Sequence, residues 1–329
     1  MSWRVAITIE LRGKEYDCIP EYIKSAGFEP VYRPNFSGDP YAIIDLLRDC
    51  DAVLAGGDRF DKRVLEALAG KLRIISRFGI GYDAVDVETA TKLGIAVTNT
   101  PMLMAPAVAE MTLGLLLTVS RHIAEFDRSL RSGKWKTTYV GTQLEGKTVG
   151  LIGFGNIPQC LAKYLLGFDC RILSYDILFN QDVAAKYNVQ FATLDEIASE
   201  SDIVSVHLPL TGSTRNIIAA PFFSKMKSGA ILVNTGRGGV VNEHDLIIAL
   251  EQKVIYGAGL DVFDMEPIPA DNPLLKMDNV VLTPHISSQT RECLKSVGKL
   301  ATDNIIDTFE NKMPRNILNP DYRLFMEAL

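Results

Sequence analysis

Short apolar runs alternate with longer, more polar stretches along most of this 329-residue chain. The runs fall into two sets, the first at 5–9, 52–56, 73–76 and 95–99, and the second at 149–153, 171–176, 203–208, 230–235, 257–263 and 280–284. Alternation of short β-rich runs with helices is typical of parallel, doubly wound sheets. The pattern therefore predicts an α/β protein made of two doubly wound parallel-sheet domains.

Helix boundaries are recognisable between these runs. Thr193 and Glu196 have the spacing of a capping box, and Asn242 is placed to cap a helix through Ala249. One long helix is predicted over residues 106–131, where apolar residues occupy too many sides for a simple surface helix. We therefore expect this helix to be buried by the second domain or by a partner subunit.

The turn after the first run of the second set has the features of a phosphate-binding loop. Residues 149–152 lead into Gly153 and Gly155, and a helix is predicted to follow. The glycines allow a tight turn and a close approach to a pyrophosphate, whose charge then lies at the helix N-terminus. Asn156 and Ile157 keep the backbone N–H groups that such a site needs.

Two nearby residues bear on this interpretation. Pro158 replaces the third glycine of the usual motif, although proline is tolerated in the first turn of a helix. A turn of this kind also occurs in proteins that bind no nucleotide, but Asp176 lies about 20 positions downstream, where a carboxylate binds a ribose 2′-hydroxyl. Residues 177–180 contain no cation for a 2′-phosphate, so NAD(H) is favoured over NADP(H).

Three polar residues follow strand-like runs later in the chain and form a candidate catalytic set. His285 and Glu266 are the components of an imidazole–carboxylate acid/base pair, and Arg237 lies among glycines that let the backbone approach an anion. Each alone has an ordinary explanation: a buried structural histidine, an exposed glutamate, an arginine on a surface turn. Because ligands bind at the carboxyl ends of parallel strands, the three together indicate one shared site.

The chain resembles the D-isomer-specific 2-hydroxyacid dehydrogenases, most closely their phosphoglycerate dehydrogenase branch. The resemblance runs from about residue 4 to about residue 316. It is carried by RFGIGYDAVD at 77–86, NTP…VAE at 99–110, GKTVGLIGFGNI at 146–157, VHLPLT at 206–211, NTGRGGVVNE at 234–243, GAGLDVFDMEP at 257–267 and TPHISS at 283–288.

This resemblance implies specific roles at the matching positions. Arg237 would bind the carboxylate and keto oxygen of the substrate, His285 would be the acid/base, and Glu266 its partner. The residues implied for binding NAD are Gly153, Gly155, Asn156, Ile157, Asp176, Leu208, Thr235, Gly236 and Asp261, the last holding the nicotinamide carboxamide. Those implied for the substrate are Gly79, Ile80 and Gly81, the last two through backbone N–H groups, together with Arg237.

The resemblance also implies the domain organisation and the partners. Residues 1–101 and 290–329 would form a flavodoxin-like substrate domain, to which a last helix at about 291–310 returns. Residues 102–289 would form a Rossmann NAD-binding domain inserted in it. The expected partners are a small 2-keto or 2-hydroxy acid and a second copy of the chain in a homodimer.

The substrate is less strongly indicated than the reaction. Met102, Leu103 and Met104 replace the polar residues usual after the NTP motif, and Gly56 stands where phosphoglycerate enzymes often carry an arginine, with Arg59 nearby. These features favour reduction of a small unphosphorylated 2-keto acid, such as hydroxypyruvate or glyoxylate. A short D-3-phosphoglycerate dehydrogenase and an NAD-sensing protein similar to transcriptional corepressors are the alternatives.

Composition agrees with this assignment. A net charge of −6 without a basic cluster makes nucleic acid and anionic membranes poor partners. The apolar stretch at 111–120 is too short to span a bilayer, and the first residues lack the apolar core of a signal peptide. Cys18, Cys50, Cys160, Cys170 and Cys293 are scattered without metal-ligand spacing, which favours free thiols in the cytoplasm and no metal.

Overall fold

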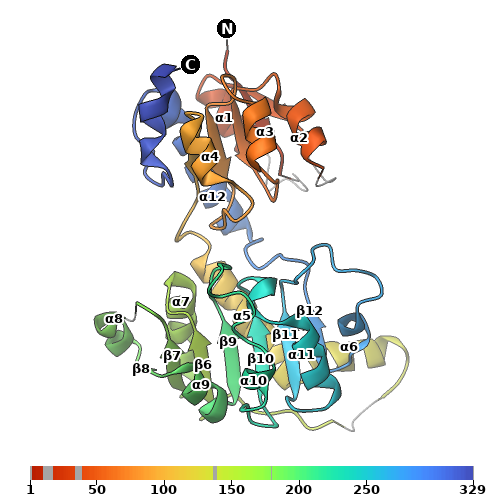
Figure 1. Ribbon diagram of the computed structural model, residues 1–329. Coiled ribbons are helices and arrows are strands. Elements are labelled where there is room, and N and C mark those ends of the chain that lie inside the picture. Colours follow the sequence, from red (N-terminus) through yellow and green to blue (C-terminus); the bar gives the residue numbers. More distant parts are fainter. Residues whose placement is uncertain (1, 10–17, 34–38, 136–138, 179, 329) are drawn as a thin grey trace. The chain divides into compact units, whose positions relative to one another are not determined.

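The computed structural model describes residues 2–9, 18–33, 39–135, 139–178 and 180–328. The chain divides into two compact units, Met1–Met104 with Gln289–Leu329, and Ala105–Ser288. In both, the described strands form a parallel sheet with helices packed on its two faces (Figure 1). The predicted fold class, two doubly wound parallel-sheet domains, is confirmed.

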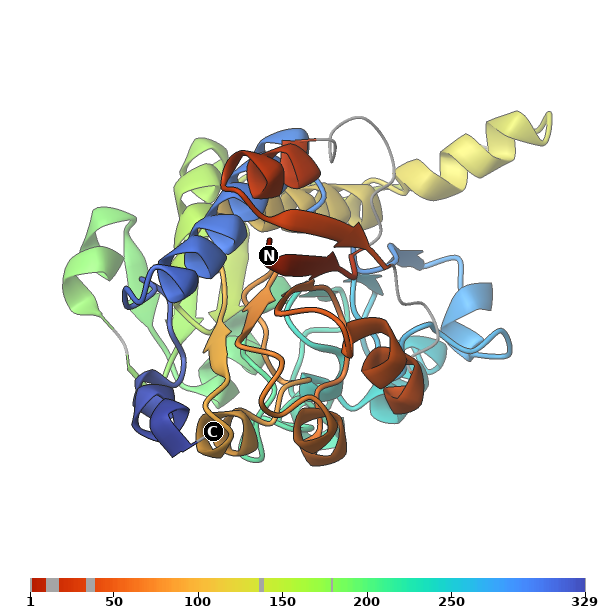
Figure 2. The ribbon, with the colours of Figure 1, turned by 90° about the horizontal axis from the view of Figure 1, so that it is seen from above.

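The first unit has a sheet of strand order β2-β1-β3-β4-β5. Its strands are β1 (Arg4–Ile7), β2 (Glu29–Tyr32), β3 (Ala52–Ala55), β4 (Ile74–Arg77) and β5 (Ala96–Thr98). Its helices are α1 (Cys18–Ser25), α2 (Pro40–Leu47), α3 (Lys62–Ala67), α4 (Val87–Lys92) and α12 (Arg291–Phe309). One apolar core lies between the sheet and α1 with α12, the other between the sheet and α2, α3 and α4 (Figure 2).

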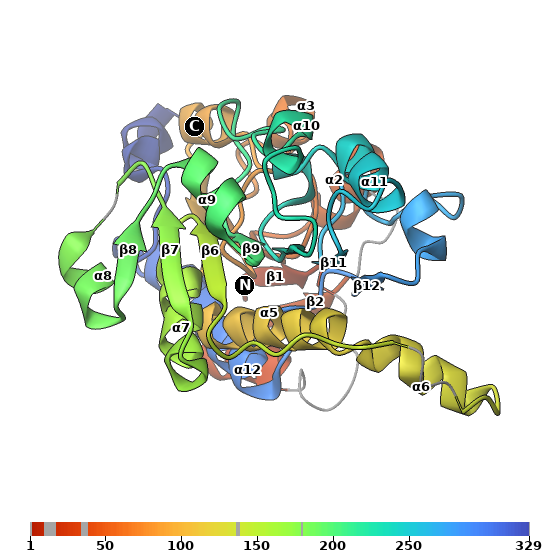
Figure 3. The ribbon, with the colours of Figure 1, turned by 90° about the horizontal axis from the view of Figure 1, so that it is seen from below.

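The second unit has a sheet of strand order β12-β11-β10-β9-β6-β7-β8. Its strands are β6 (Thr148–Ile152), β7 (Arg171–Tyr175), β8 (Val189–Phe191), β9 (Ile203–Val206), β10 (Ile231–Asn234), β11 (Gly257–Leu260) and β12 (Val280–Leu282). Its helices are α5 (Ala105–Ser120), α6 (Ile123–Arg131), α7 (Asn156–Leu165), α8 (Gln181–Lys186), α9 (Leu194–Glu200), α10 (Ala220–Phe223) and α11 (Glu243–Glu251). Figure 3 shows α5 and α7 on one face of the sheet, and α9, α10 and α11 on the other.

The order of this second sheet locates its ligand-binding edge. The chain proceeds outward from β6 through β7 to β8, then returns to β9 and proceeds in the opposite direction to β12. The crevice beyond the carboxyl ends of β6 and β9 is therefore the topological switch point, where doubly wound sheets bind their ligands.

The helix starts confirm the local signals in the sequence. Thr193 and Glu196 form a complete capping box at the start of α9. The side chain of Asn242 accepts a hydrogen bond from the N–H of Asp245 (3.1 Å) and so caps α11. Caps of this kind satisfy N–H groups that a helix leaves without an internal partner.

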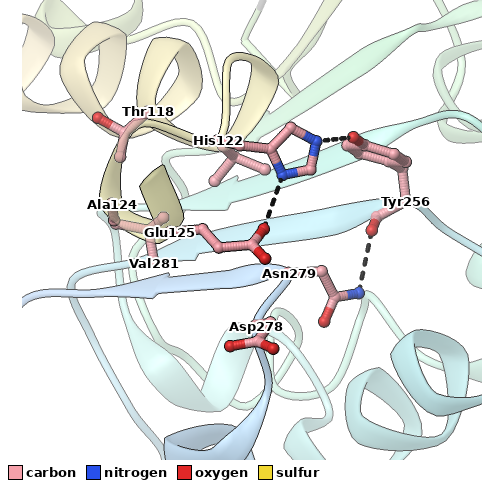
Figure 4. Close-up of a pocket in the computed structure, with 9 residues that line it drawn as sticks. Thr118, His122, Ala124, Glu125, Tyr256, Asp278, Asn279 and Val281 are labelled. Carbon is pink, nitrogen blue, oxygen red and sulfur yellow. Dashed lines mark hydrogen bonds and ion pairs between the residues drawn. The ribbon is translucent and has the colours of Figure 1, made fainter. Parts of the chain in front are cut away.

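The prediction of one helix over residues 106–131 is wrong. The chain forms α5 and α6, bent by 65° at a break where His122 adopts a left-handed backbone (φ 53°). Neither glycine nor proline marks this break in the sequence. Buried polar contacts stabilise it: His122 Nδ1 lies 3.3 Å from Glu125 Oε2, and Nε2 contacts the hydroxyl of Tyr256 (Figure 4).

The two halves of that segment have different surroundings. Much of α5 is buried against β10 and β11, whereas α6 projects away from the rest of the second unit (Figures 2 and 3). Across the described residues, no one helix has the length and apolar character to cross a bilayer, and α5 and α6 meet that criterion only when counted together.

Candidate active site

The three residues of the candidate catalytic set follow three neighbouring strands. Arg237 comes after β10, Glu266 after β11 and His285 after β12. These strands pair in parallel in this order, so their carboxyl ends meet at one edge of the sheet. The topology thus gathers residues that are 48 positions apart in the sequence (285 − 237).

His285 and Glu266 form a hydrogen-bonded pair. Nδ1 of His285 lies 2.7 Å from Oε2 of Glu266, while Oε1 of Glu266 accepts a hydrogen bond from the N–H of Phe263 (3.0 Å). The two side chains are 49% and 37% exposed, so the pair is accessible to a small molecule. Because Nδ1 is engaged, the other ring nitrogen of His285 remains for a substrate.

The charges within this pair shift both titrations. The hydrogen bond that His285 donates to Glu266 raises the pKa of His285, and this effect outweighs burial, which lowers it. Burial raises the pKa of Glu266, but the hydrogen bond and charge of His285 bring the net shift below the ordinary value. The arrangement stabilises an imidazolium–carboxylate pair, the protonation state that a proton donor needs.

Arg237 lies on a loop that is fixed at both sides. The side chain of Asn234 donates to the carbonyl of Arg237 (3.0 Å) and accepts from the N–H of Gly236 (3.0 Å). The positive charge of Arg237 acts to lower the pKa of both members of the histidine–glutamate pair, which places its guanidinium within electrostatic reach of them. The structure therefore brings the three predicted residues together.

Gly238 allows the loop that carries Arg237 to pack closely against the start of the loop that carries Glu266. A Cβ at position 238 would lie 1.9 Å from the carbonyl oxygen of Phe263. Since both contacting groups are backbone, neither can move aside as a flexible side chain would. Only glycine allows this contact between the two loops.

Asp261 holds the loop that carries His285. The side chain is fully buried, and its oxygens accept hydrogen bonds from the N–H groups of Ile286 and Ser287 (2.9 Å each) and from the hydroxyls of Thr283 (2.6 Å) and Ser287. His285 itself has a left-handed backbone (φ 52°), a conformation that persists where neighbouring contacts enforce it. This positioning role of Asp261 was not predicted from the sequence, and its expected contact with a carboxamide stays a prediction.

The glycine turn after β6 has the shape that a dinucleotide phosphate requires. Gly153 has φ +100°, and a Cβ there would lie 3.2 Å from the carbonyl oxygen of His207. Gly155 is the residue before α7, and no heavy atom lies within 4 Å of a Cβ built on it. Pro158 is buried in the first turn of α7, so the helix forms without the third glycine.

Asp176 is placed beside this turn. Its Oδ2 accepts from the N–H of Phe154 (2.6 Å) and its Oδ1 from the N–H of Leu178 (2.9 Å), which leaves one acceptor site on each oxygen for a diol. Ile177 and Leu178 are each 84% exposed, and Phe179 lies outside the described residues. An open glycine turn at a helix N-terminus with a carboxylate beside it fits an NAD molecule.

The remaining residues implied for the cofactor lie at adjoining strand ends. A Cβ on Gly236 would be 3.3 Å from the carbonyl oxygen of Leu208, so the segments after β9 and β10 approach closely. The hydroxyl of Thr235 lies 2.8 Å from that of Thr112 on α5. This places Leu208, Thr235 and Gly236 on the same edge as the glycine turn.

The substrate residues implied by the resemblance are in the first unit. Their loop, 79–81, is held through its carbonyls: Ile80 accepts from the side chain of Asn99 (2.9 Å) and Gly81 from Nε of Arg77 (3.2 Å). Within the described residues the N–H groups of Ile80 and Gly81 make no hydrogen bond. Such a loop presents donors without reorganisation.

Two further residues near the site were not singled out from the sequence. Glu243 and Asn272 contact each other and the loop that carries Glu266. Glu243 is the first residue of α11, where an acidic residue is adequately explained by the helix dipole. Among the described residues, no group of three or more histidine, cysteine, aspartate or glutamate side chains could hold a metal ion.

Comparison with known proteins gives the same assignment. Residues 113–287 match the family model described as D-isomer specific 2-hydroxyacid dehydrogenase, NAD binding domain. The chain is 38% identical over 327 residues to a glyoxylate reductase of Korarchaeum cryptofilum, covering 98% of this chain and 97% of that protein. It is 48% identical over 235 residues to a hydroxypyruvate reductase of Thermotoga maritima, covering 70% and 76%.

A solved structure extends the similarity to the fold. The D-lactate dehydrogenase of Lactobacillus jensenii, solved with NAD+, has a TM-score of 0.78 and 29% identity, covering 96% of this chain and 99% of that one. The second unit contains the whole of the matched NAD-binding domain, so the predicted Rossmann domain and NAD as cofactor are confirmed. The chain belongs to the family of D-isomer-specific 2-hydroxyacid dehydrogenases.

Proposed function

We propose that this chain uses NADH to reduce small unphosphorylated 2-keto acids, such as glyoxylate or hydroxypyruvate, to 2-hydroxy acids. As a member of its family it is an NAD-dependent oxidoreductase that acts on the CH–OH group of its donors. The observation that carries the proposal is the His285–Glu266 pair within the field of Arg237, at the carboxyl edge of a nucleotide-binding sheet. The names of two relatives support the substrate class.

The proposed chemistry assigns one task to each catalytic side chain. When bound, NADH supplies the hydride that reduces the keto carbon. Protonated His285 donates its proton to the carbonyl oxygen, and Glu266 keeps the imidazole oriented and charged. Arg237 binds the carboxylate and carbonyl oxygen through its planar guanidinium and stabilises the negative charge that develops. In the oxidative direction neutral His285 accepts the proton.

The sheet order suggests how the cofactor contacts are distributed. The carboxylate of Asp176 follows β7, next to β6, and so receives the adenosine ribose, while the turn after β6 receives the pyrophosphate. The residues that would hold the nicotinamide half follow β9, β10 and β11. The proposed contacts, in that order, are Asp176, Gly153, Gly155, Asn156, Ile157, Leu208, Thr235, Gly236 and Asp261.

We assign substrate binding by backbone groups to the first unit. The N–H groups of Ile80 and Gly81 are suited to a substrate carboxylate, because their loop is already held by side chains of the same unit. The domain roles follow: residues 1–101 with 290–329 bind the substrate, and residues 102–289 bind NAD. The units found in the structure have closely similar bounds.

The residues near this loop favour a substrate without a phosphate. Asp58 is buried, and its carboxylate accepts hydrogen bonds from the hydroxyl of Thr8 and the N–H of Gly56 (3.1 Å). Arg59, the adjacent cation, is exposed. The methyl group of Met104 lies 3.9 Å from a Cβ position on Gly79, so an apolar side chain borders the loop there. A dianionic phosphate usually recruits several donors, whereas here Arg59 stands beside the carboxylate of Asp58 and Arg77 is already bonded to the carbonyl of Gly81.

A comparison of substrates tests the proposed preference for an unphosphorylated 2-keto acid. Relative kcat/KM values with NADH for glyoxylate, hydroxypyruvate, pyruvate and phosphohydroxypyruvate should be highest for one of the first two. If phosphohydroxypyruvate has the highest value, and loses its advantage in Arg59→Ala, the chain is instead a short D-3-phosphoglycerate dehydrogenase. An absence of turnover with every acid, together with intact NADH binding, would favour the NAD-sensing alternative.

A homodimer is proposed from the projecting helix. Beyond the exposed Ile123 and Leu130 of α6, Trp135 and Val140 are 85% and 89% exposed. The helix α6 and the residues that flank it thus expose several apolar side chains, which is typical of an interface with another protein. Replacing Trp135 and Val140 by Ser should weaken dimerisation at least tenfold in analytical ultracentrifugation, whereas Leu324→Ser, at an exposed position in the first unit, should not.

The proposed location is the cytoplasm, without nucleic-acid or membrane partners. All five cysteines are free thiols, which a reducing compartment maintains, and the net charge of −6 disfavours polyanionic partners. Fractionation of the source cells checks the location.

A further inference from the structure

The segment 264–272 carries Glu266 and contains neither a strand nor a helix; Ile268 packs against the apolar core, and Asp264 lies 4.0 Å from Arg215. Residues 264–267 are exposed. In the part of the chain that the structure describes, the backbone-to-backbone hydrogen bonding of 264–271 consists of the carbonyl of Pro269 with the N–H of Asn272 (3.0 Å). A nine-residue segment this open needs other contacts if it is to keep Glu266 beside His285.

One carboxylate outside the segment contacts both of its ends. Oε2 of Glu243 accepts from the N–H of Asp264 (3.2 Å), and Oε1 accepts from Nδ2 of Asn272 (2.7 Å). Asn272 is buried, and its Oδ1 caps the next turn by accepting from the N–H of Leu274 (3.0 Å). The orientation of the Asn272 amide is thus determined on both sides.

We propose that Glu243 is a positioning residue for the reaction: it fixes both ends of the segment 264–272 and so keeps Glu266 against His285. This inference rests on the proposed function only for its effect on turnover. Glu243 touches neither the Glu266 nor the His285 side chain. It therefore acts through the backbone between Asp264 and Asn272. Glu266 therefore keeps its hydrogen bond to His285 at an exposed site without a rigid strand or helix beneath it.

The hydrogen-bond pattern predicts that replacing Glu243 by glutamine, its neutral isostere, disrupts the contacts of the segment 264–272. In Glu243→Gln one acceptor becomes an NH2 group, which faces either the N–H of Asp264 or Nδ2 of Asn272. Asn272 cannot rotate its amide to accept without losing its bond to Leu274. Whichever orientation the glutamine takes, two donors oppose each other and one end of the segment is released.

A reciprocal exchange should restore the contact. In Asn272→Asp alone, two carboxylates face each other and repel. In the double variant Glu243→Gln with Asn272→Asp, the glutamine amide donates to one aspartate oxygen, and the other still accepts from the N–H of Leu274. The total charge of the pair is unchanged, so a general electrostatic effect is separated from the specific contact.

The primary measurement is the pKa of His285, followed by NMR of 13Cε1-labelled histidine and assigned with His285→Gln. The chain has four histidines, so the spectrum is simple. We expect the pKa of His285 to fall by about half a unit or more in each single variant, because the Glu266 contact that raises it is lost. It should return to within about 0.2 unit of wild type in the double variant. Glu251→Gln, an exposed position on the same helix, is the matched control and should leave it unchanged.

Turnover supplies the second measurement. With the best 2-keto acid, kcat/KM should fall about twofold to threefold in the single variants, no more than in Glu266→Gln, and recover in the double variant, while NADH binding is unaffected. If no 2-keto acid is reduced by the wild type and the His285 titration still shifts, the proposed function fails and the positioning role stands. An unshifted titration in a folded Glu243→Gln protein overturns the positioning role. If that variant does not fold, Glu243→Asp, too short to reach both ends, takes its place.

Discussion

The two loops that carry the acid/base pair are built in different ways. The His285 loop, 283–287, is held by a buried carboxylate, Asp261, that accepts four hydrogen bonds from it. The Glu266 loop, 264–272, is exposed near its catalytic residue and is fixed at its two ends by Glu243. The loop of the proton donor is therefore held by a carboxylate along its length, whereas the segment that carries its partner is held by one at its two ends. The difference suggests that the position of the histidine is critical and that the main effect of the glutamate is to raise the pKa of the histidine.

The largest effect should come from the proton donor itself. His285→Gln keeps a polar side chain of similar size but cannot transfer a proton, so kcat should fall about 100-fold or more. NADH affinity should be nearly unchanged in a fluorescence titration. His244→Gln, an exposed position on α11, is the control. A kcat close to wild type would mean that His285 is structural.

Removing the carboxylate that holds the His285 loop should have the next largest effect. In Asp261→Asn an NH2 group faces donors of the 283–287 loop within a fully buried site. Leaving buried donors without acceptors costs about 1–3 kcal/mol, so the free energy of unfolding should fall by that amount. We expect kcat to fall roughly 30-fold, because His285 is no longer held in its left-handed conformation. If urea unfolding and kcat are both unaffected, the comparison between the loops is wrong.

The contact between the loop that carries Arg237 and the loop that carries Glu266 can be tested by adding one methyl group at Gly238. In Gly238→Ala the new Cβ would overlap the carbonyl oxygen of Phe263, which it would approach to 1.9 Å. The backbone must shift, at a cost of about 1–3 kcal/mol in stability, and kcat/KM should fall roughly tenfold. At Gly212 no heavy atom lies within 4 Å of the Cβ position, so Gly212→Ala should leave both quantities near wild type.

Sequence reasoning succeeded where a signal is local. Apolar runs located most strands, and glycines with Asp176 indicated the dinucleotide site, because strand ends and tight turns depend on neighbouring residues. The edge strands β2 and β8 were missed, since each is partly exposed and lacks a continuous apolar run. The break between α5 and α6 depends on contacts of His122 with Tyr256, 134 positions away, and could not be read locally.

The supports of the two catalytic loops escaped prediction for a similar reason. Asp261 finds its donors at residues 283, 286 and 287, and Glu243 at 264 and 272. Only the folded topology shows from which donors each carboxylate accepts its hydrogen bonds. A buried carboxylate and an N-terminal helix acid look alike in sequence, although one holds the His285 loop and the other the Glu266 loop.

The smallest effect on rate, and the sharpest test of tuning, should come from Glu266→Gln. In the wild type Glu266 raises the pKa of His285, so the imidazolium persists to higher pH, and reductive kcat/KM falls only as pH rises through that raised value. In the variant this contribution is lost, while burial and Arg237, which both lower the pKa, remain. The fall should therefore begin at lower pH, and the rise of oxidative activity, which needs neutral His285, should move the same way. At acidic pH, where the histidine is protonated in both proteins, kcat should differ only about threefold. If the pH profile stays in place while the rate falls at every pH, Glu266 orients His285 without tuning its charge.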